Sequence, residues 1–173
     1  MDKAKKVFRN PLFMTAAGAG FGILAKYGDI AYANSIFSYF GLLTSGFAIW
    51  LVIGTAIIYI SSSRKQLSVL LSAFMLPMLL AYYLFSVLVV KYFNMKIALF
   101  WCAAFAGSLL IGNIIFPKRH TKLFEALFII ASVVFIILDA IMINGVNILL
   151  ILCESALCII TIISISRKIK HKS

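Results

Sequence analysis

Long apolar runs separated by short polar segments make up most of the chain. A helix needs about 20 apolar residues to cross the ~30 Å hydrocarbon core of a bilayer, because it rises ~1.5 Å per residue. The runs lack the apolar-polar alternation of membrane strands. The predicted spans are residues 12–32, 41–60, 67–90, 97–116, 123–143 and 146–165. The pattern therefore predicts an all-α membrane protein built as a six-transmembrane-helix bundle.

The segments between these spans are short, so no domain boundary is visible. Short connections make sequential helices antiparallel neighbours in one bundle. We expect residues 1–173 to form a single integral membrane domain. The longest connection, residues 28–40, is rich in aromatic residues and is typical of a segment in the membrane interface.

Composition agrees with a membrane location. Hydrophobic residues make up 64% of the chain and charged residues 12%, and the mean hydropathy is +1.09. Such a chain has too little polar surface to cover a soluble globule of 173 residues.

Lysine and arginine gather at alternate boundaries of the spans. Thirteen of the sixteen precede the first span, follow the last, or lie between residues 61 and 66 or 117 and 122; the others are Lys26, Lys91 and Lys96. Because cytoplasmic loops retain cations, this alternation predicts six crossings with the N and C termini both cytoplasmic. The net charge of +11 predicts contact with the lipid bilayer and with anionic lipid head groups at the cytoplasmic face. No nucleic acid is expected, since no segment is long enough to form a soluble basic surface.

The first span has an alternative assignment as a cleaved signal peptide. It has a charged start, an apolar run over residues 12–24 and the small-residue triplet Ala31-Tyr32-Ala33. Lys26 and Asp29 lie between the run and the triplet, which favours a retained helix. Cleavage would leave five spans.

Small residues form a face on the first predicted helix. Gly18 and Gly22 have the spacing that lets two helix backbones approach closely, and Ala16 and Gly20 lie beside them. We predict that this face packs against a neighbouring helix of the same chain, or alternatively docks a membrane protein partner. Pro77, in the middle of the third span, predicts a kink there.

Ionisable residues within the spans are the main functional signal. Each costs ~2.5–3.5 kcal/mol to insert unless it is paired or hydrated. Glu154 lies about 12 Å into the last span, at ~1.5 Å per residue, and needs a partner. Lys26 is the first choice of partner; alternatively Lys26 pairs with Asp29 one turn away. The predicted ligand-binding determinants in the outer half of the bundle are Glu154, Asp139, Lys26, Tyr82 and Tyr83.

Motifs of known catalytic chemistry are not found. The chain contains no nucleophile elbow, paired-histidine zinc motif or phosphate loop. Cys102, Cys153 and Cys158 lie within predicted spans and have neither metal-ligand nor disulfide-framework spacing. We therefore expect no catalytic residue, no metal and no cofactor, and a protein that is not an enzyme.

Several apolar motifs resemble those of a known group of membrane proteins. They are residues 20–27 (GFGILAKY), Ala48-Ile49-Trp50 with Gly54, residues 82–86 (YYLFS), and residues 99–103 (LFWCA) with Gly107. Together they resemble an uncharacterised bacterial family of small multi-span membrane proteins that carries only a domain-of-unknown-function label. The resemblance covers residues 12–116 and implies a multi-pass protein of the bacterial cytoplasmic membrane.

The topology also resembles the substrate-binding membrane subunits of energy-coupling-factor transporters. In those subunits small residues of the first helix dock against a transmembrane coupling subunit, and the last three helices with the first loop enclose the substrate. Ala16 and Gly20 match that docking pattern here, without its strict alanine-to-alanine spacing. The resemblance implies a membrane protein partner at the first helix.

Two functions follow from these observations. The first is a transport-associated protein that binds a small solute in an outward-facing polar cavity reaching Glu154. The alternative is a non-catalytic accessory or scaffold subunit of a membrane protein complex, in which the buried acids only pair internally.

Overall fold

The fold is known from a computed structural model, which describes residues 6–31, 36–142 and 147–170. Every regular element in these ranges is a helix, so the all-α prediction is confirmed. The α-helices are α2 (Pro11–Ile30), α3 (Ile36–Ser45), α4 (Phe47–Ile60), α5 (Arg64–Phe85), α6 (Met95–Ile115), α7 (Lys122–Met142) and α8 (Ile148–Lys170). A π-helix (Ser86–Val90) extends α5, and a 3-10 turn (Phe116–Lys118) follows α6.

Four of the helical segments are long and apolar enough to cross a membrane. They are Arg64–Val90, Met95–Lys118, Lys122–Ile141 and Ile148–Ile169. They agree with the last four predicted spans to within a few residues, apart from the predicted boundaries at residues 143 and 146, which lie outside the described ranges. Polar side chains define several of the starts: Ser63 accepts a hydrogen bond from the Gln66 amide before α5, and Asn94 does the same for Lys96 before α6.

The prediction of one uninterrupted span over residues 41–60 is wrong. The region forms two helices, α3 and α4, which meet at Gly46 with a bend of 73° and together have the length of one span. Helix α3 also includes residues 36–40, which belong to the connection that the sequence predicts to lie in the membrane interface. By contrast, α5 continues through Pro77 without interruption.

The first predicted span corresponds to α2, which is helical over 20 residues. It is not among the segments apolar enough to cross by composition. Its glycines, together with Lys26 and Asp29, dilute the hydrophobicity that the other helices have. The end of the predicted span at Tyr32 lies outside the described residues.

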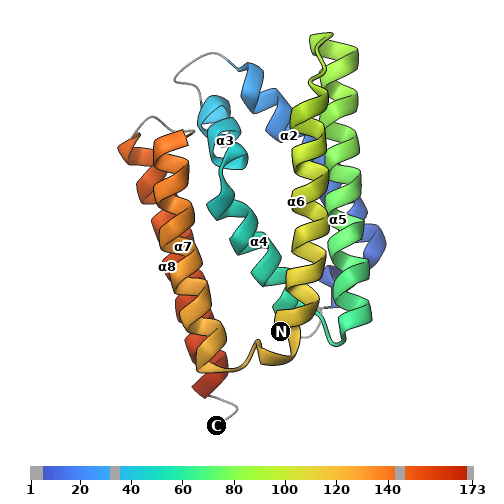
Figure 1. Cartoon of the computed structure of the whole chain (residues 1–173). Helices are drawn as coiled ribbons and strands as arrows, with labels where there is room; N and C mark the ends of the chain where they lie inside the picture. Colours follow the sequence, from blue (N-terminus) through green and yellow to red (C-terminus); the bar gives the residue numbers. More distant parts are fainter. Residues whose placement is uncertain (1–5, 32–35, 143–146, 171–173) are drawn as a thin grey trace.

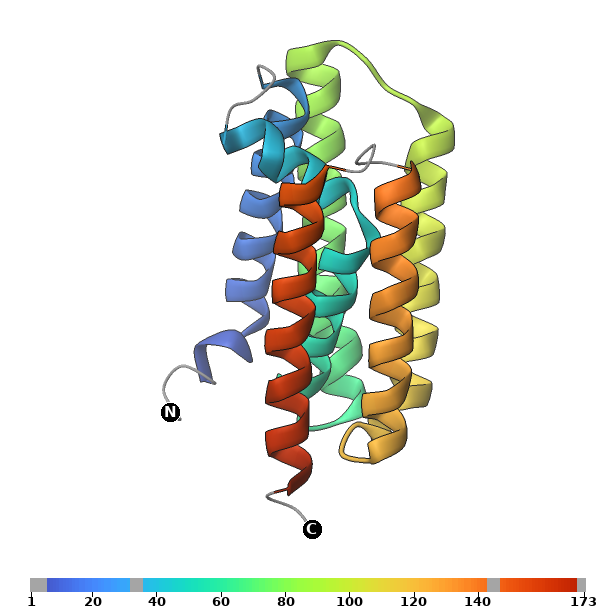
Figure 2. The same ribbon diagram turned by 90° about the vertical axis from the view of Figure 1, so that its left-hand side faces the viewer.

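The helices stand roughly side by side around α4. Figure 1 shows α4 between the α7–α8 pair and the α5–α6 pair, and α4 contacts all four of these helices. In the turned view, α2 begins and α8 ends at the same end of the bundle (Figure 2). Contacts between basic segments agree: Arg9 Nε donates to the Ile60 carbonyl at 2.6 Å, and Lys168 Nζ lies 4.2 Å from the Tyr59 ring centroid. We call the end of the bundle at which Arg9, Ile60, Tyr59 and Lys168 meet the basic end.

The glycine face of α2 packs inside the bundle against α5. A Cβ atom at Gly18 would overlap the Phe74 carbonyl oxygen, and one at Gly22 would overlap that of Met78. Gly18 and Gly22 therefore face α5 of the same chain. Ala16 and Gly20 lie on the opposite, exposed face, and a Cβ at Gly20 would meet nothing within 4 Å.

Large apolar side chains cover the outer surfaces of the helices. Leu80, Leu110, Ile114 and Ile141 are each about 70% exposed. A water-soluble monomer rarely exposes so much contiguous apolar surface, whereas lipid tails solvate it without cost. The long apolar helices and this surface together support a membrane-embedded protein.

Candidate functional site

The interruption at Gly46 is the centre of the candidate site. Helix α4 starts there without a side-chain cap of its own, since Gly46 is extended and has no side chain to offer. The Asp139 carboxylate, on α7, fills that role: it accepts hydrogen bonds from the Phe47 amide at 2.8 Å and the Ala48 amide at 2.9 Å. At the other side of the break, Trp50 Nε1 donates to the Thr44 carbonyl at 2.9 Å. Side chains thus satisfy backbone groups that an uninterrupted helix would pair internally.

Asp139 and Glu154 converge on this break from α7 and α8. Their exposed fractions are 0% and 1%. A Cβ atom at Gly46 would lie 2.8 Å from Asp139 Oδ2 and 3.1 Å from Glu154 Oε1. Both carboxyl groups therefore press against the same backbone position. A side chain at this position would require the carboxyl groups to shift.

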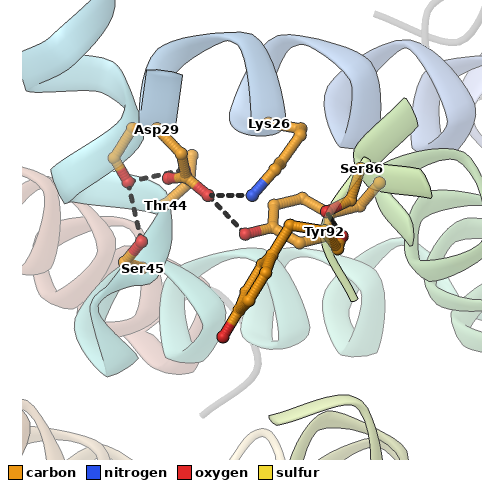
Figure 3. A network of polar contacts seen from close by, with 8 residues as sticks. Lys26, Asp29, Thr44, Ser45, Ser86 and Tyr92 are labelled. Carbon is orange, nitrogen blue, oxygen red and sulfur yellow. Dashed lines mark hydrogen bonds and ion pairs between the residues drawn. The ribbon is translucent and has the colours of Figure 1, made fainter. Parts of the chain in front are cut away.

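A second polar cluster lies on the other side of α3. Lys26 Nζ is 3.7 Å from Asp29 Oδ2, one turn along α2, and 4.9 Å from the ring centroid of Tyr82. The Tyr82 hydroxyl donates a hydrogen bond to the same Asp29 oxygen. Figure 3 shows Lys26 and Asp29 pointing toward each other, with Thr44 and Ser45 of α3 beside them. The side chains of Lys26 and Asp29 are 12% and 21% exposed, so this pair is close to the surface of the bundle.

A small cavity of about 40 Å³ lies between the break and this cluster. Its polar edge is formed by Thr44, Ser45 and the tyrosines, and its apolar wall includes Trp50 and Trp101, whose ring centroids are 5.8 Å apart. The Tyr83 hydroxyl is buried and has no hydrogen-bond partner among the described residues. At ~10–15 Å³ of such volume per molecule, the cavity of about 40 Å³ holds about three or four waters at most. Its lining does not include Asp139 or Glu154.

The five predicted ligand-binding residues fall into two groups. Asp139 and Glu154 meet at Gly46. Lys26, predicted as the first choice of partner for Glu154, lies beside Asp29, and the Tyr82 hydroxyl also contacts Asp29. Tyr83 lines the cavity together with Tyr82. The pairing of Lys26 with Asp29 is thus the alternative that the structure supports, because a spacing of three residues places both on one face of α2.

Sequence reasoning missed the residues that build the break. Thr44, Ser45 and Gly46 interrupt an otherwise apolar run and carried the only local signal. Such residues are common inside single membrane helices, so they did not predict an interruption. The role of Trp50 as a donor to the end of α3 had no sequence signal at all.

No group of three or more His, Cys, Asp and Glu side chains suited to a metal ion occurs in the described ranges. Within them, Cys102 and Cys153 are exposed and Cys158 is buried, each as a free thiol.

Comparison with known proteins gave no family: no family model, no curated protein and no solved structure matches the chain.

Proposed function

We propose that this chain is a transport-associated protein of the bacterial cytoplasmic membrane that binds a small solute from the outer side of the bundle. The single observation that carries the proposal is the interrupted α3–α4 span, with a small cavity that has a polar edge on one side and two buried carboxyls on the other. Interrupted helices near the middle of a membrane are typical of transporter binding sites, where freed backbone groups and buried ionisable side chains act together.

In this proposal the solute enters beside Lys26 and Asp29 and binds against Tyr82 and Tyr83. The cavity is too small for more than a few waters, so solute binding requires α3 to move relative to α4. Gly46 is the hinge, because its backbone joins the two helices at a 73° bend. Asp139 holds the start of α4 through two backbone hydrogen bonds, so its carboxylate governs how readily the hinge moves.

Accessibility of Ser45 tests this proposal without knowledge of the solute. Ser45→Cys is made in a background in which Cys102, Cys153 and Cys158 are alanine. Proteoliposomes are then treated from outside with a charged, membrane-impermeant thiol reagent. We expect labelling of Ser45→Cys, and a several-fold faster rate when Asp139→Asn weakens the hydrogen bonds to α4.

Ser164→Cys is the matched control, since Ser164 is an exposed serine on the apolar surface of α8, where a charged reagent does not dissolve. Absence of labelling at Ser45 in folded protein, with and without Asp139→Asn, would contradict an outward cavity.

The second function is a non-catalytic accessory or scaffold subunit of a membrane complex. One observation favours it: Ala16 and Gly20 leave an open, small-residue face on α2. A partner helix would approach closely there, as the resemblance to energy-coupling-factor subunits implies. This function would be favoured over transport if Ser45→Cys is not labelled and if a partner co-purifies with the chain but not with the Gly20→Leu variant.

Both functions rest on the same proposed topology. With six crossings, the basic end would be cytoplasmic and would contact anionic lipid head groups. The uncharacterised bacterial family suggested by the apolar motifs fits this membrane and topology.

A further inference from the structure

A groove between α5 and α6 near the basic end has no role in the proposed function. It has a volume of about 540 Å³ and is open to the outer surface. On α5 it is lined by Arg64, Ser68 and Ser72. These residues are spaced four apart and therefore share one face of the helix. The polar row extends ~12 Å along the axis, at ~1.5 Å per residue.

The opposite wall of the groove comes from α6. Asn113 Nδ2 donates to Ser68 Oγ at 2.9 Å and to the Leu109 carbonyl at 2.8 Å. Beside it, Leu110 and Ile114 are 68% and 70% exposed. The groove thus combines polar groups at its floor with an apolar rim that lipid tails would solvate.

Arg64 is the only charged residue that lines the groove, and in the described part of the chain it makes no ion pair. A guanidinium at a membrane interface binds phosphate by bidentate, charge-assisted hydrogen bonds. Polar groups that open toward hydrocarbon are costly unless something covers them with hydrogen-bonding atoms. The occupant must therefore offer an anion at Arg64, hydrogen-bond acceptors at Ser68 and Ser72, and an apolar chain beside them on Leu110 and Ile114.

We propose that this groove binds one anionic phospholipid of the leaflet at the basic end. The phosphate lies against Arg64, the glycerol ester oxygens accept hydrogen bonds from Ser68 and Ser72, and an acyl chain packs on Leu110 and Ile114. Because Asn113 bonds to Ser68 across the groove, Leu110 and Ile114 flank the polar row, so the acyl chain lies beside the polar groups. This site is separate from the cavity at Gly46 and does not depend on transport.

Lipid titration of the purified full chain in detergent tests the site. Native mass spectrometry counts bound dioleoyl phosphatidylglycerol and, separately, dioleoyl phosphatidylcholine. We expect Arg64→Gln to lower the apparent affinity for phosphatidylglycerol roughly tenfold, as for loss of a charge-assisted hydrogen-bonded pair, with little change for phosphatidylcholine. Ser72→Phe should also displace the lipid by filling the groove, without changing the charge.

Lys65→Gln is the matched control, because it removes the same charge at the next residue but does not line the groove. An equal loss in Lys65→Gln and Arg64→Gln would overturn the proposal in favour of diffuse surface attraction. A disulfide between two copies carrying Ser72→Cys, in the cysteine-free background, would overturn it in favour of a second copy in the groove. Binding lost in Arg64→Gln and Ser72→Phe but kept in Lys65→Gln would support it.

Discussion

Two acidic clusters lie on opposite sides of the bend at Gly46, and they are stabilised in different ways. Asp29 is close to the surface and is held by side chains, the ammonium of Lys26 and the hydroxyl of Tyr82. Asp139 is fully buried and is held by the backbone, through the first amides of α4. Near the interface, water and a lysine suffice to stabilise a carboxylate. Deeper in the bundle, an interrupted helix supplies the donors.

This difference also gives the two acids different structural importance. If Asp29 is lost, Lys26 and Tyr82 can turn toward water, since their cluster is partly exposed. If Asp139 is lost, two amides at the start of α4, one buried and one partly buried, are left without their acceptor. The comparison therefore predicts a clear order of mutational effects.

The largest effect is expected for Asp139→Ala. Leaving the Phe47 and Ala48 amides unpaired in the interior should lower the free energy of unfolding by roughly 3 kcal/mol, at 1–3 kcal/mol for each unsatisfied group. The melting temperature in detergent, followed by circular dichroism, measures this loss. Asp139→Asn keeps one of the two acceptor oxygens, so it satisfies one of the two amides and should lose less. Equal stability of Asp139→Ala and the unmodified protein would show that the cap on α4 is dispensable.

A smaller loss is expected for Gly46→Ala. The added methyl would lie 2.8 Å from Asp139 Oδ2 and 3.1 Å from Glu154 Oε1, so the carboxyls must shift. Overpacking of this kind costs about 1–3 kcal/mol. The control is Gly54→Ala further along α4, where the methyl meets nothing within 4 Å.

Because alanine is the better helix former, Gly54→Ala should be neutral or stabilising by up to ~1 kcal/mol. The same melting experiment compares the two variants. If Gly46→Ala and Gly54→Ala lower the melting temperature equally, contact with the carboxyls at Gly46 does not explain the loss.

The smallest effect is expected for Asp29→Asn. Exposed or partly exposed ion pairs contribute about 0–1 kcal/mol, and the amide can still accept a hydrogen bond from Tyr82. The melting temperature should fall little, and the residual loss should shrink at high salt as screening increases. A loss as large as that of Asp139→Ala would remove the distinction between the two clusters.

Much of the helical content was predictable from hydrophobicity alone. The spans that became α5, α6, α7 and α8 were found because about 20 consecutive apolar residues have few alternatives to a membrane helix. The pairing of Lys26 with Asp29 was among the alternatives for the same kind of reason, since it depends only on spacing along one helix.

The interruption of the α3–α4 span was not predictable in this way. An apolar run containing Thr44, Ser45 and Gly46 fits a continuous helix equally well by composition. What stabilises the break is an acceptor from α7, which is 91 residues away along the chain from the Ala48 amide it receives. Local sequence propensity cannot predict a hydrogen-bond acceptor from so distant a residue.

The amino-acid sequence by itself determined that the chain is helical and apolar, that its basic segments alternate, and that a few acids lie within apolar runs. These properties depend on local composition and on periodicity. Only the tertiary structure decided which acids meet: Asp139 with Glu154 at Gly46, and Asp29 with Lys26 and Tyr82. The reason is physical, because a buried carboxylate takes whichever donors packing brings within reach, and here the nearest are the unpaired amides of an interrupted helix.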